Sequence, residues 1–434
     1  MDDIQHKKAI RAWTMYDWAN STFATTIMAA VLPVYYSSVA SEGLSRSTAT
    51  SNWAFTTSIA LILVGVLGPI LGAMADFSGS KKRFMTIFVI IGVFGTALLF
   101  FVKSGDWLMA SFFYIIASIG FSGANVFYDS LLPHVANPDE IDQVSSRGYA
   151  MGYAGGGILL AINLAMIMLS PESMTILMTR LSFLTVSVWW FVFTIPFWKN
   201  VNEPKRRVYA HEAGFNPVKA SLKRLGNTFS EIKKYKELTK FIVAFWLYNN
   251  GIGTIIFMAS IYGTELGFSS TTTIGTLLMV QFVAIPFAFL FGWLAKKIGT
   301  KPSILLSLVI YTMIAIGGYF LYKEIQFWIL GFAVAMVQGG SQALSRSLCG
   351  RMMPKSKSAE FFSFFSVSEK IAGTLGPFVF GMVSRLMGGS RLSIVSLIIF
   401  FAAGGFLLSR VNEKEGIAVA EREEQILTST TSID

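Results

Sequence analysis

Few charged side chains interrupt the long apolar segments of this 434-residue chain, and those few are the first candidates for chemistry. Asp17, Asp129 and Arg346 lie inside apolar segments, as do the adjacent residues Glu369 and Lys370. A charge near the centre of a membrane helix costs about 2.5–3.5 kcal/mol on insertion scales, so such groups usually pair or serve an ion or solute pathway. These side chains could therefore carry a proton, bind a charged solute, or form ion pairs that break during a conformational change.

Two interpretations of these charges stay open at the level of sequence. Asp129, Arg346 and Arg147, which opens the next apolar segment, favour an intracellular gate in which acids and bases pair between helices. Asp17 and the pair at 369–370 favour a proton or solute site, because intramembrane ionisable groups often mark such pathways. The acid of that pair lies about nine residues, or roughly 13 Å, from the nearer end of its segment.

Uncharged polar and aromatic side chains form a second set of candidates in the same segments. The first segment carries hydroxyls and amides more densely than helix packing requires. Amides and hydroxyls beside aromatic rings suit a small polar or zwitterionic solute. We expect the following residues to line a binding cavity: Tyr16 and Asn20 in the first segment, Tyr248, Asn249 and Asn250 in the seventh, and Gln338 and Gln342 in the tenth.

Several kinds of chemistry are excluded by what the chain lacks. Cys349 is its single cysteine, so no disulfide framework and no cysteine-rich metal site can form. The three histidines, His6, His134 and His211, fall in polar segments and do not predict a metal site or a proton relay. There is no nucleotide-binding glycine loop and no Ser–His constellation. We therefore expect no metal, no cofactor and no enzymatic activity.

The elements that hold these residues are long apolar segments. Hydrophobic residues make up 53% of the chain, charged residues only 14%, and the mean hydropathy is +0.57, too apolar for a water-facing surface. The segments are continuous over about 20 residues, as membrane helices are, whereas barrel strands alternate over about 10. Twelve spans are predicted near 13–39, 52–75, 84–102, 107–131, 147–169, 180–198, 241–262, 273–295, 302–322, 327–348, 361–386 and 391–409.

Lysine and arginine positions set the predicted orientation. With both termini in the cytoplasm, 27 of the 35 basic residues fall on the cytoplasmic side and six on the other. This asymmetry follows the positive-inside rule. It also accounts for the net charge of +10 without a nucleic-acid partner. The partner of this charge is the lipid bilayer.

A basic segment divides the spans into two groups of six. Within it, Val218, Leu222, Leu225, Phe229 and Ile232 share one helical face opposite lysines, which predicts an amphipathic helix on the inner leaflet. The predicted organisation is a six-helix bundle over 1–199, a basic cytoplasmic linker over 200–239, a second bundle over 240–412 and a cytoplasmic tail over 413–434.

The two groups repeat one another in parallel topology. The pattern Gly-x-x-x-Asp-x-x-Gly-x-Lys, which contains Asp76 and Lys81, follows the second span, and a copy offset by 220 residues follows the eighth. Asp76 can cap a neighbouring helix and pair with a cation, which would lock the cytoplasmic side. Lys296 replaces the acid in the second copy, so we expect the charge lock mainly in the first half. The pattern resembles the loop motif of the major facilitator superfamily.

Longer motifs carry a more specific resemblance. The segments 16–21 (YDWANS), 128–133 (YDSLLP), 145–150 (SSRGYA) and 342–347 (QALSRS) closely resemble the autophagy-related vacuole effluxer family and its bacterial relatives. The resemblance implies the all-helical major facilitator fold and secondary transport without ATP, with amino-acid efflux from the vacuole in fungal members. The family's seventh span tends to carry an acid where Asn250 stands here, which puts proton coupling at that position in doubt.

We therefore expect a multi-pass, monomeric transporter in a bacterial plasma membrane. It would move a small polar solute, with amino acids as the implied class, by rocking its two halves about a midplane cavity, and a proton is the candidate coupling ion. Two other hypotheses stay open: export of amphipathic drugs or lipids, and a membrane sensor that binds its ligand without transporting it.

Overall fold

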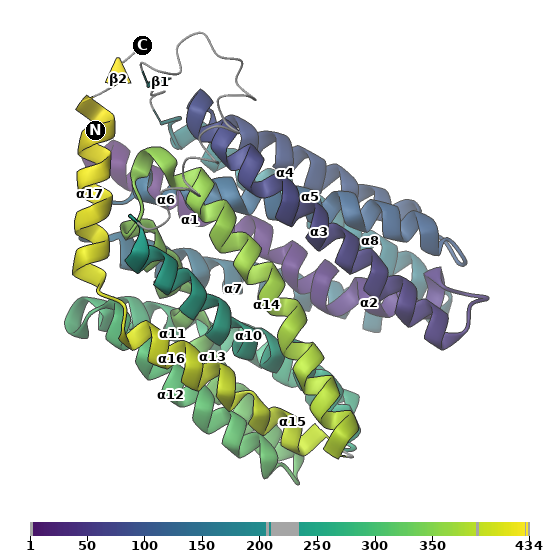
Figure 1. Cartoon of the computed structure of the whole chain (residues 1–434). Coiled ribbons are helices and arrows are strands. Elements are labelled where there is room, and N and C mark those ends of the chain that lie inside the picture. The colour runs from purple at the N-terminus through teal and green to yellow at the C-terminus, as the bar shows by residue number, and fades with distance from the viewer. Residues whose placement is uncertain (1–2, 205–207, 210–233, 388–389, 430, 433–434) are drawn as a thin grey trace.

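The described part of the chain is almost entirely helical (Figure 1). The computed structural model describes residues 3–204, 208–209, 234–387, 390–429 and 431–432. Within them, eleven helical segments are long and apolar enough to cross a bilayer, and they confirm eleven of the predicted spans. The remaining predicted span, near 361–386, falls within one continuous helix, Ser358–Met387.

The first half of the chain is a bundle of long helices joined by short turns. Its elements are α1 (Asp3–Thr22), η1 (Phe23–Ala30), α2 (Val31–Tyr35), η2 (Tyr36–Ala40), α3 (Arg46–Ser78), α4 (Lys81–Leu98), η3 (Leu99–Phe101), α5 (Trp107–Ser130), α6 (Leu132–Val135), α7 (Ile141–Met168), η4 (Glu172–Met174) and α8 (Thr175–Asn200).

The second half repeats this pattern after a short strand, β1 (Val208–Tyr209). The amphipathic helix predicted around 218–232 lies outside the described residues. The elements that follow are α10 (Lys236–Glu265), α11 (Ser270–Ile298), α12 (Thr300–Tyr319), α13 (Glu324–Arg351), η6 (Lys355–Lys357), α14 (Ser358–Met387), α15 (Ser390–Ser396), α16 (Ile398–Ser409), α17 (Glu413–Ser429) and β2 (Thr431–Ser432).

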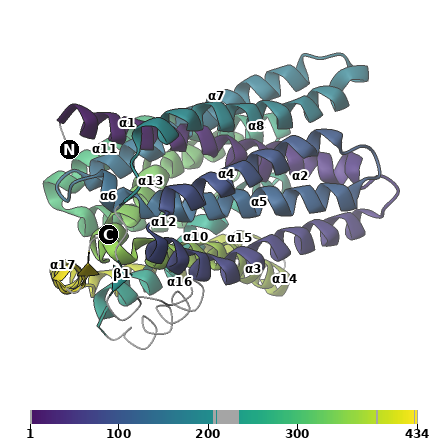
Figure 2. The same ribbon diagram turned by 90° about the horizontal axis from the view of Figure 1, so that it is seen from above.

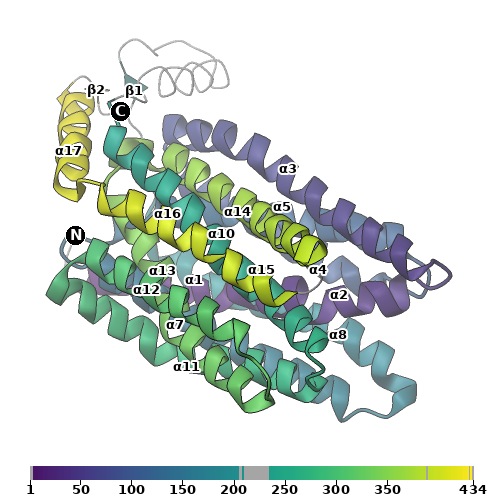
Figure 3. The same cartoon turned by 60° about the horizontal axis from the view of Figure 1, so that its bottom comes forward.

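The long helices run roughly parallel to one another, and both chain ends lie at the same end of the bundle (Figure 2). We call this end the terminal face; it is formed by α6, η6 and α17. The helix α17 lies outside the bundle and at a steep angle to the long helices (Figure 3). The tail beyond the last long helix is therefore folded along most of its length.

Each half has its own hydrophobic core. One core gathers buried residues of α1 to α8 together with Ala359 of α14, and the other runs from Tyr235 to Val411. Between the halves, α7 packs against α11 and α13, and α14 packs against α3 and α5. Two separately packed units that share an interface can move against each other without rebuilding either core.

The internal repeat is visible in equivalent contacts. Gly79 and Gly299, which end α3 and α11, both have positive φ values, of 62° and 96°, which glycine adopts without strain. Lys82 donates to the carbonyl of Val201 at 2.7 Å, and Lys301 donates to that of Val411 at 2.9 Å. In each half, a lysine at the start of the third helix thus binds the end of the sixth.

Glycines allow the closest helix contacts in the first half. A Cβ atom added to Gly152 or Gly155 of α7 would lie 2.5 or 2.3 Å from atoms of α1, so the glycine face of α7 serves close packing. A Cβ on Gly120 of α5 would lie 2.2 Å from the backbone nitrogen of Gly92 in α4. These crossings leave no room for even one methyl group.

We predict that Gly120→Ala lowers the thermal unfolding midpoint of the detergent-purified protein, because the backbones of α4 and α5 must separate. Overpacking of this kind costs about 1–3 kcal/mol. Gly381→Ala is the matched control, since an added Cβ at Gly381 meets nothing within 4 Å. Equal midpoints for the two variants would contradict the predicted close crossing.

Candidate functional site

Arg346 of α13 joins the two halves of the chain through two carboxylates. Its Nη2 lies 3.2 Å from Asp17 Oδ2 of α1, and its Nη1 lies 3.2 Å from Asp129 Oδ1 of α5. The Arg346 side chain is 4% exposed, and the two acids are 12% and 18% exposed. A guanidinium is well suited to this position because its fixed fork of donors can bind two acceptors at once.

Further donors and acceptors complete the surroundings of the guanidinium. Arg346 Nε donates to Ser145 Oγ and its Nη2 to the Ser145 carbonyl, both at 2.9 Å, while Tyr128 donates to Asp17 Oδ2 at 2.7 Å. The rings of Trp13 and Tyr149 lie 4.8 and 4.4 Å from the guanidinium carbon. Aromatic faces stabilise a desolvated cation, so these rings add to the stabilisation that the two carboxylates give the buried charge.

A glycine makes room for this arrangement. A Cβ on Gly148 would lie 2.3 Å from Asp17 Oδ2 and 2.9 Å from Arg346 Nη2. Asp17 and Asp129 were separate predictions, one for a solute or proton site and one for a gate, and the structure brings both to the same arginine. Arg147, the third gate candidate, is exposed and takes no part in the described contacts of this cluster.

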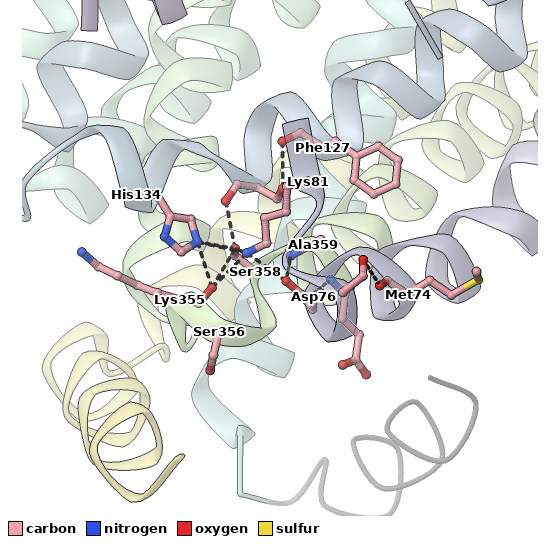
Figure 4. A network of polar contacts seen from close by, with 12 residues as sticks. Met74, Asp76, Lys81, Phe127, His134, Lys355, Ser356, Ser358 and Ala359 are labelled. Atoms are coloured by element: carbon pink, nitrogen blue, oxygen red, sulfur yellow. Dashed lines mark hydrogen bonds and ion pairs between the residues drawn. The ribbon is translucent and has the colours of Figure 1, made fainter. Parts of the chain in front are cut away.

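A second contact between the halves uses the glycine-rich loop between α3 and α4 (Figure 4). Asp76 Oδ2 accepts from the backbone nitrogen of Glu360 at 2.8 Å, and Oδ1 accepts from that of Ala359 at 3.3 Å. Both nitrogens belong to the first turn of α14, where unpaired N–H groups and the helix dipole favour an anion. Asp76 therefore caps a helix of the other half.

Lys81 neutralises Asp76 and binds the same segment of the second half (Figure 4). Its Nζ lies 2.8 Å from Asp76 Oδ1, 2.6 Å from Ser358 Oγ and 3.1 Å from the Lys355 carbonyl. The two charged side chains are 3% and 1% exposed. The predicted pairing of Asp76 with a cation and a helix terminus is therefore present in the structure.

A third contact was not predicted from the sequence. Asp142, near the start of α7, accepts hydrogen bonds from Ser347 and, at 2.7 Å, from Thr300, and lies 3.4 Å from Arg351. The expected pair of the first-half motif, Asp76 with Lys81, is present, and this contact adds a second acid of the first half, Asp142. The second loop copy lacks an acid because the acid comes from the facing helix. The replacement of that acid by Lys296 was the signal that could have directed attention to Asp142.

The polar candidates of the first half, Tyr16 and Asn20, contact other residues of that half. Tyr16 is fully buried among aromatic rings, and its ring centre lies 4.7 Å from that of Tyr128. Asn20 donates to Asn125 at 2.6 Å, an amide pair between α1 and α5. Both residues therefore contribute to the packing of the first bundle.

The candidates of the second half differ in their surroundings. Tyr248 shares a hydrogen bond of 2.6 Å with Ser345. Asn250 accepts from the backbone nitrogen of Gly376, in α14, at 3.1 Å. Asn249 is buried, Gln338 is 9% exposed and Gln342 is half-buried. The side chains of Glu369 and Lys370 lie outside the described residues.

A cavity of about 100 Å³ lies inside the second half, between α10, α11, α12, α13 and α15. Most of its lining is aliphatic or aromatic, and Gln338, Gln281 and Thr276 supply polar groups. The Thr276 hydroxyl is buried without a hydrogen-bond partner in the structure. A Cβ on Gly157 of α7 would lie 3.1 Å from Gln281, so this end of the cavity borders the first half. Gln281 and Thr276 were not predicted, since single polar residues in apolar runs carry little signal.

Within the residues that the structure describes, no group of three or more His, Cys, Asp or Glu side chains could hold a metal ion. The chemistry of the described site consists of ion pairing, hydrogen bonding and apolar contact. Such interactions form and break without a covalent step.

We predict that Gly148→Ala weakens the contact between Asp17 and Arg346, because the added methyl group displaces the carboxylate. Removing one partner from a buried ion pair costs up to about 3–5 kcal/mol. Hydrogen–deuterium exchange of residues 141–150 should become faster, whereas Gly253→Ala, whose Cβ would make only ordinary contacts at 3.9 Å, should leave it unchanged. Unchanged exchange in the Gly148 variant would show that the pair does not hold this region.

Comparison with known proteins agrees with this geometry. The family model described as "Vacuole effluxer Atg22 like" matches residues 5–421. The MFS-type transporter YxiO of Bacillus subtilis is 38% identical over 96% of this chain and 98% of its own length. Autophagy-related protein 22-1 of Penicillium rubens is 22% identical over 89% of this chain and 81% of its own length.

Solved structures show the same fold. The proton:xylose symporter XylE bound to 6-bromo-6-deoxy-D-glucose superposes with a TM-score of 0.74 at 14% identity, covering 98% of this chain and all of that one. The transporter FucP in its outward conformation gives a TM-score of 0.69 at 13% identity, covering 94% and 99%. These are folds of transporters and not of enzymes. The predicted resemblance is confirmed, and the chain belongs to the vacuole effluxer Atg22-like family of major facilitator transporters.

Proposed function

We propose that this protein is a secondary active transporter that moves a small solute with a polar head, amino acids being the leading class, by alternating access. The observation that carries the proposal is that the two separately packed halves are joined at the terminal face by ion pairs and hydrogen bonds. Contacts of this kind can break in one state and re-form in another, which the rocking of two halves requires.

The terminal face is the cytoplasmic side in this proposal. Its support is the excess of lysine and arginine in the segments at that end, since cytoplasmic loops of membrane proteins are enriched in these residues. The protein in this proposal has twelve spans and lies in a bacterial plasma membrane. The same excess of basic residues places both of its termini in the cytoplasm. A monomer suffices, because one chain supplies both halves of the pathway. The state described here is then closed toward the cytoplasm.

The cavity of the second half supports a solute that combines a polar group with an apolar one. Gln338 and Gln281 can bind a polar head, and the aliphatic and aromatic walls can enclose a side chain of a few carbons. An apolar cavity of about 150 Å³ binds benzene, so about 100 Å³ suits a smaller group. An amino acid with an apolar side chain fits this description.

The apolar lining also favours a second candidate function, the export of amphipathic compounds. Such compounds would use the walls of the cavity without needing Gln338. A thermal-shift screen of the purified protein against amino acids, peptides, sugars, nucleosides and hydrophobic cations separates the two. Stabilisation by hydrophobic cations alone would support the second candidate and contradict the first.

We predict that Gln338→Leu weakens binding of the solute found by the screen by about tenfold, because the removed amide leaves a polar head unpaired. The measurement is the dissociation constant from the concentration dependence of the thermal shift. Gln5→Leu, an exposed change in α1, should bind as the native protein does. Equal affinity in both variants would remove Gln338 from the binding site.

Asp17 is the titratable candidate for proton coupling within the described residues of the cluster. Its carboxylate faces Arg346 in the closed state and would lose that cation when the halves part. The ion pair of Asp17 with Arg346 thus links this side chain directly to the opening of the halves. Asn250 cannot take this role, since an amide does not titrate.

We predict that Asp17→Asn lowers proton-driven solute uptake into proteoliposomes by about tenfold, while solute counterflow, which needs no net proton movement, is retained in larger part. Asp139→Asn, on the exposed surface, is the matched control. The companion variant Glu369→Gln tests the second acid. If both variants keep counterflow and proton-driven uptake intact, the proton-site assignment is wrong.

A further inference from the structure

The C-terminal helix α17 contacts the second-half side of two of the gate contacts described above. We propose that α17 is an internal clamp that holds the cytoplasmic gate closed and must shift for the gate to open. The inference rests on the proposed alternating-access function and adds a regulatory element to it. The evidence consists of the contacts at the two ends of the helix, its attachment to the linker and the space beneath it.

The helix begins at the Asp142 contact. Glu413, in its first turn, lies 3.0 Å from Arg351, whose other partner is Asp142 of the first half. Just before the helix, the backbone nitrogen of Asn412 donates to Glu237 at 2.7 Å. The start of α17 is thereby fixed to α13 and α10, beside a residue that bridges the halves.

The later turns of the helix reach the Asp76 contact. Glu424 accepts from both the backbone nitrogen and the hydroxyl of Ser356, at 3.0 and 2.8 Å. Ser356 lies in η6, directly before the α14 turn that Asp76 caps and beside the Lys355 carbonyl that Lys81 binds. Residues 355–360 are thus held on one side by the first half and on the other by α17.

Because the first half and α17 both bind this turn, a shift of α17 changes the gate contact of Asp76 and Lys81. Lys81 needs the Lys355 carbonyl and Ser358 Oγ at fixed positions, because hydrogen bonds weaken steeply with distance and angle. A carboxylate on the Ser356 N–H fixes this short turn in place. Without Glu424, the turn loses one of its two anchors, and the gate contact becomes less favourable.

The chain end also ties α17 to the linker. Strand β2, which follows α17, pairs in antiparallel fashion with β1, with Val208 opposite Ser432 and Tyr209 opposite Thr431. A few residues before β1, Glu203 accepts from the backbone nitrogens of Lys82 and Arg83, at 2.8 and 3.1 Å. The segment after α17 is therefore joined to a linker that is anchored on the first half.

The helix α17 covers a cavity. A cavity of about 400 Å³ lies between α17 and the first half, with Pro133 and Ile141 on one wall and Ile417 and Ala420 on the other. Ala420 is buried, but Glu421 and Ile426 are exposed. Ile417 and Val419 are partly buried against the second core, so release of α17 uncovers the edge of that core and costs less than unfolding it.

The test uses a single cysteine that is hidden while the gate is closed. Ser146 of α7 is fully buried against Gly292 of α11, across the interface of the halves. In a Cys349→Ala background, Ser146→Cys should react with N-ethylmaleimide only when the halves part. The purified full-length protein in detergent gives the reference rate.

Two variants weaken the clamp to different extents, and a variant of a neighbouring residue in α17 serves as the control. We expect labelling about threefold faster with Glu424→Gln and about tenfold faster in a chain ending at Gly416, where tenfold corresponds to about 1.4 kcal/mol. The shortened chain keeps the pair between Glu413 and Arg351. Glu421→Gln, at an exposed residue that borders the same cavity one turn before Glu424, should label at the reference rate.

Each outcome decides for or against the clamp. Equal rates in all variants, with thermal unfolding midpoints within a few degrees of the reference, would overturn it, as would equal acceleration by Glu421→Gln. A synthetic peptide of residues 413–434 should slow labelling of the shortened chain again, and failure to do so would also count against the clamp. Labelling requires no solute, so loss of transport with normal labelling would contradict the proposed function and leave the clamp intact.

Discussion

The rest of the structure depends on one constraint: a guanidinium buried between two halves of a membrane protein must keep its charge neutralised. Arg346 meets this constraint with Asp17 and Asp129, which come from two different helices of the other half. Breaking one partner of a buried pair costs about 3–5 kcal/mol, so the halves cannot part there unless another charge, a proton or water replaces what is lost. A transporter can use that condition, because opening then depends on what enters the site.

The other two contacts follow the same principle at helix ends, where the free backbone N–H groups carry positive potential. Asp76 caps the first turn of α14 from across the interface, and Asp142 gathers two hydroxyls and Arg351 beside the start of α7. The Asp76 and Lys81 side chains are as buried as Arg346, at 1% and 3% exposed, whereas Asp142 and Arg351 are 14% and 18% exposed. The described contacts between the halves therefore include two buried charge clusters, at Arg346 and at Asp76, and a more exposed one at Asp142.

The sequence alone identified those functional candidates whose residue type is rare at their position in the chain. Asp17, Asp129 and Arg346 were identified because charge is rare within apolar helices, and Asp76 and Lys81 because their loop motif is local. Their pairing was not predictable, since Arg346 and Asp17 are 329 positions apart and meet only through the packing of the two bundles. Asp142 and Arg351 were missed because charges at helix ends are common. Asn250 was placed among solute ligands, and its bond to the Gly376 backbone depends on the path of α14.

The repeat of the two halves is close in backbone and unequal in charge, and this inequality bears on how the gate moves. In the first half the acid is on the loop and caps a helix through backbone groups, whereas in the second the loop supplies a hydroxyl and the acid comes from the facing helix. The first arrangement depends on the position of a short turn, 355–360, and the second on a flexible arginine side chain that a second acid, Glu413, also binds. A turn must move as a unit, while an arginine can follow its partner through its rotamers. In the proposed alternating-access cycle, the contact of Asp76 with α14 would therefore break as a unit, and the segment that holds its turn in place would have the larger influence on when the halves part.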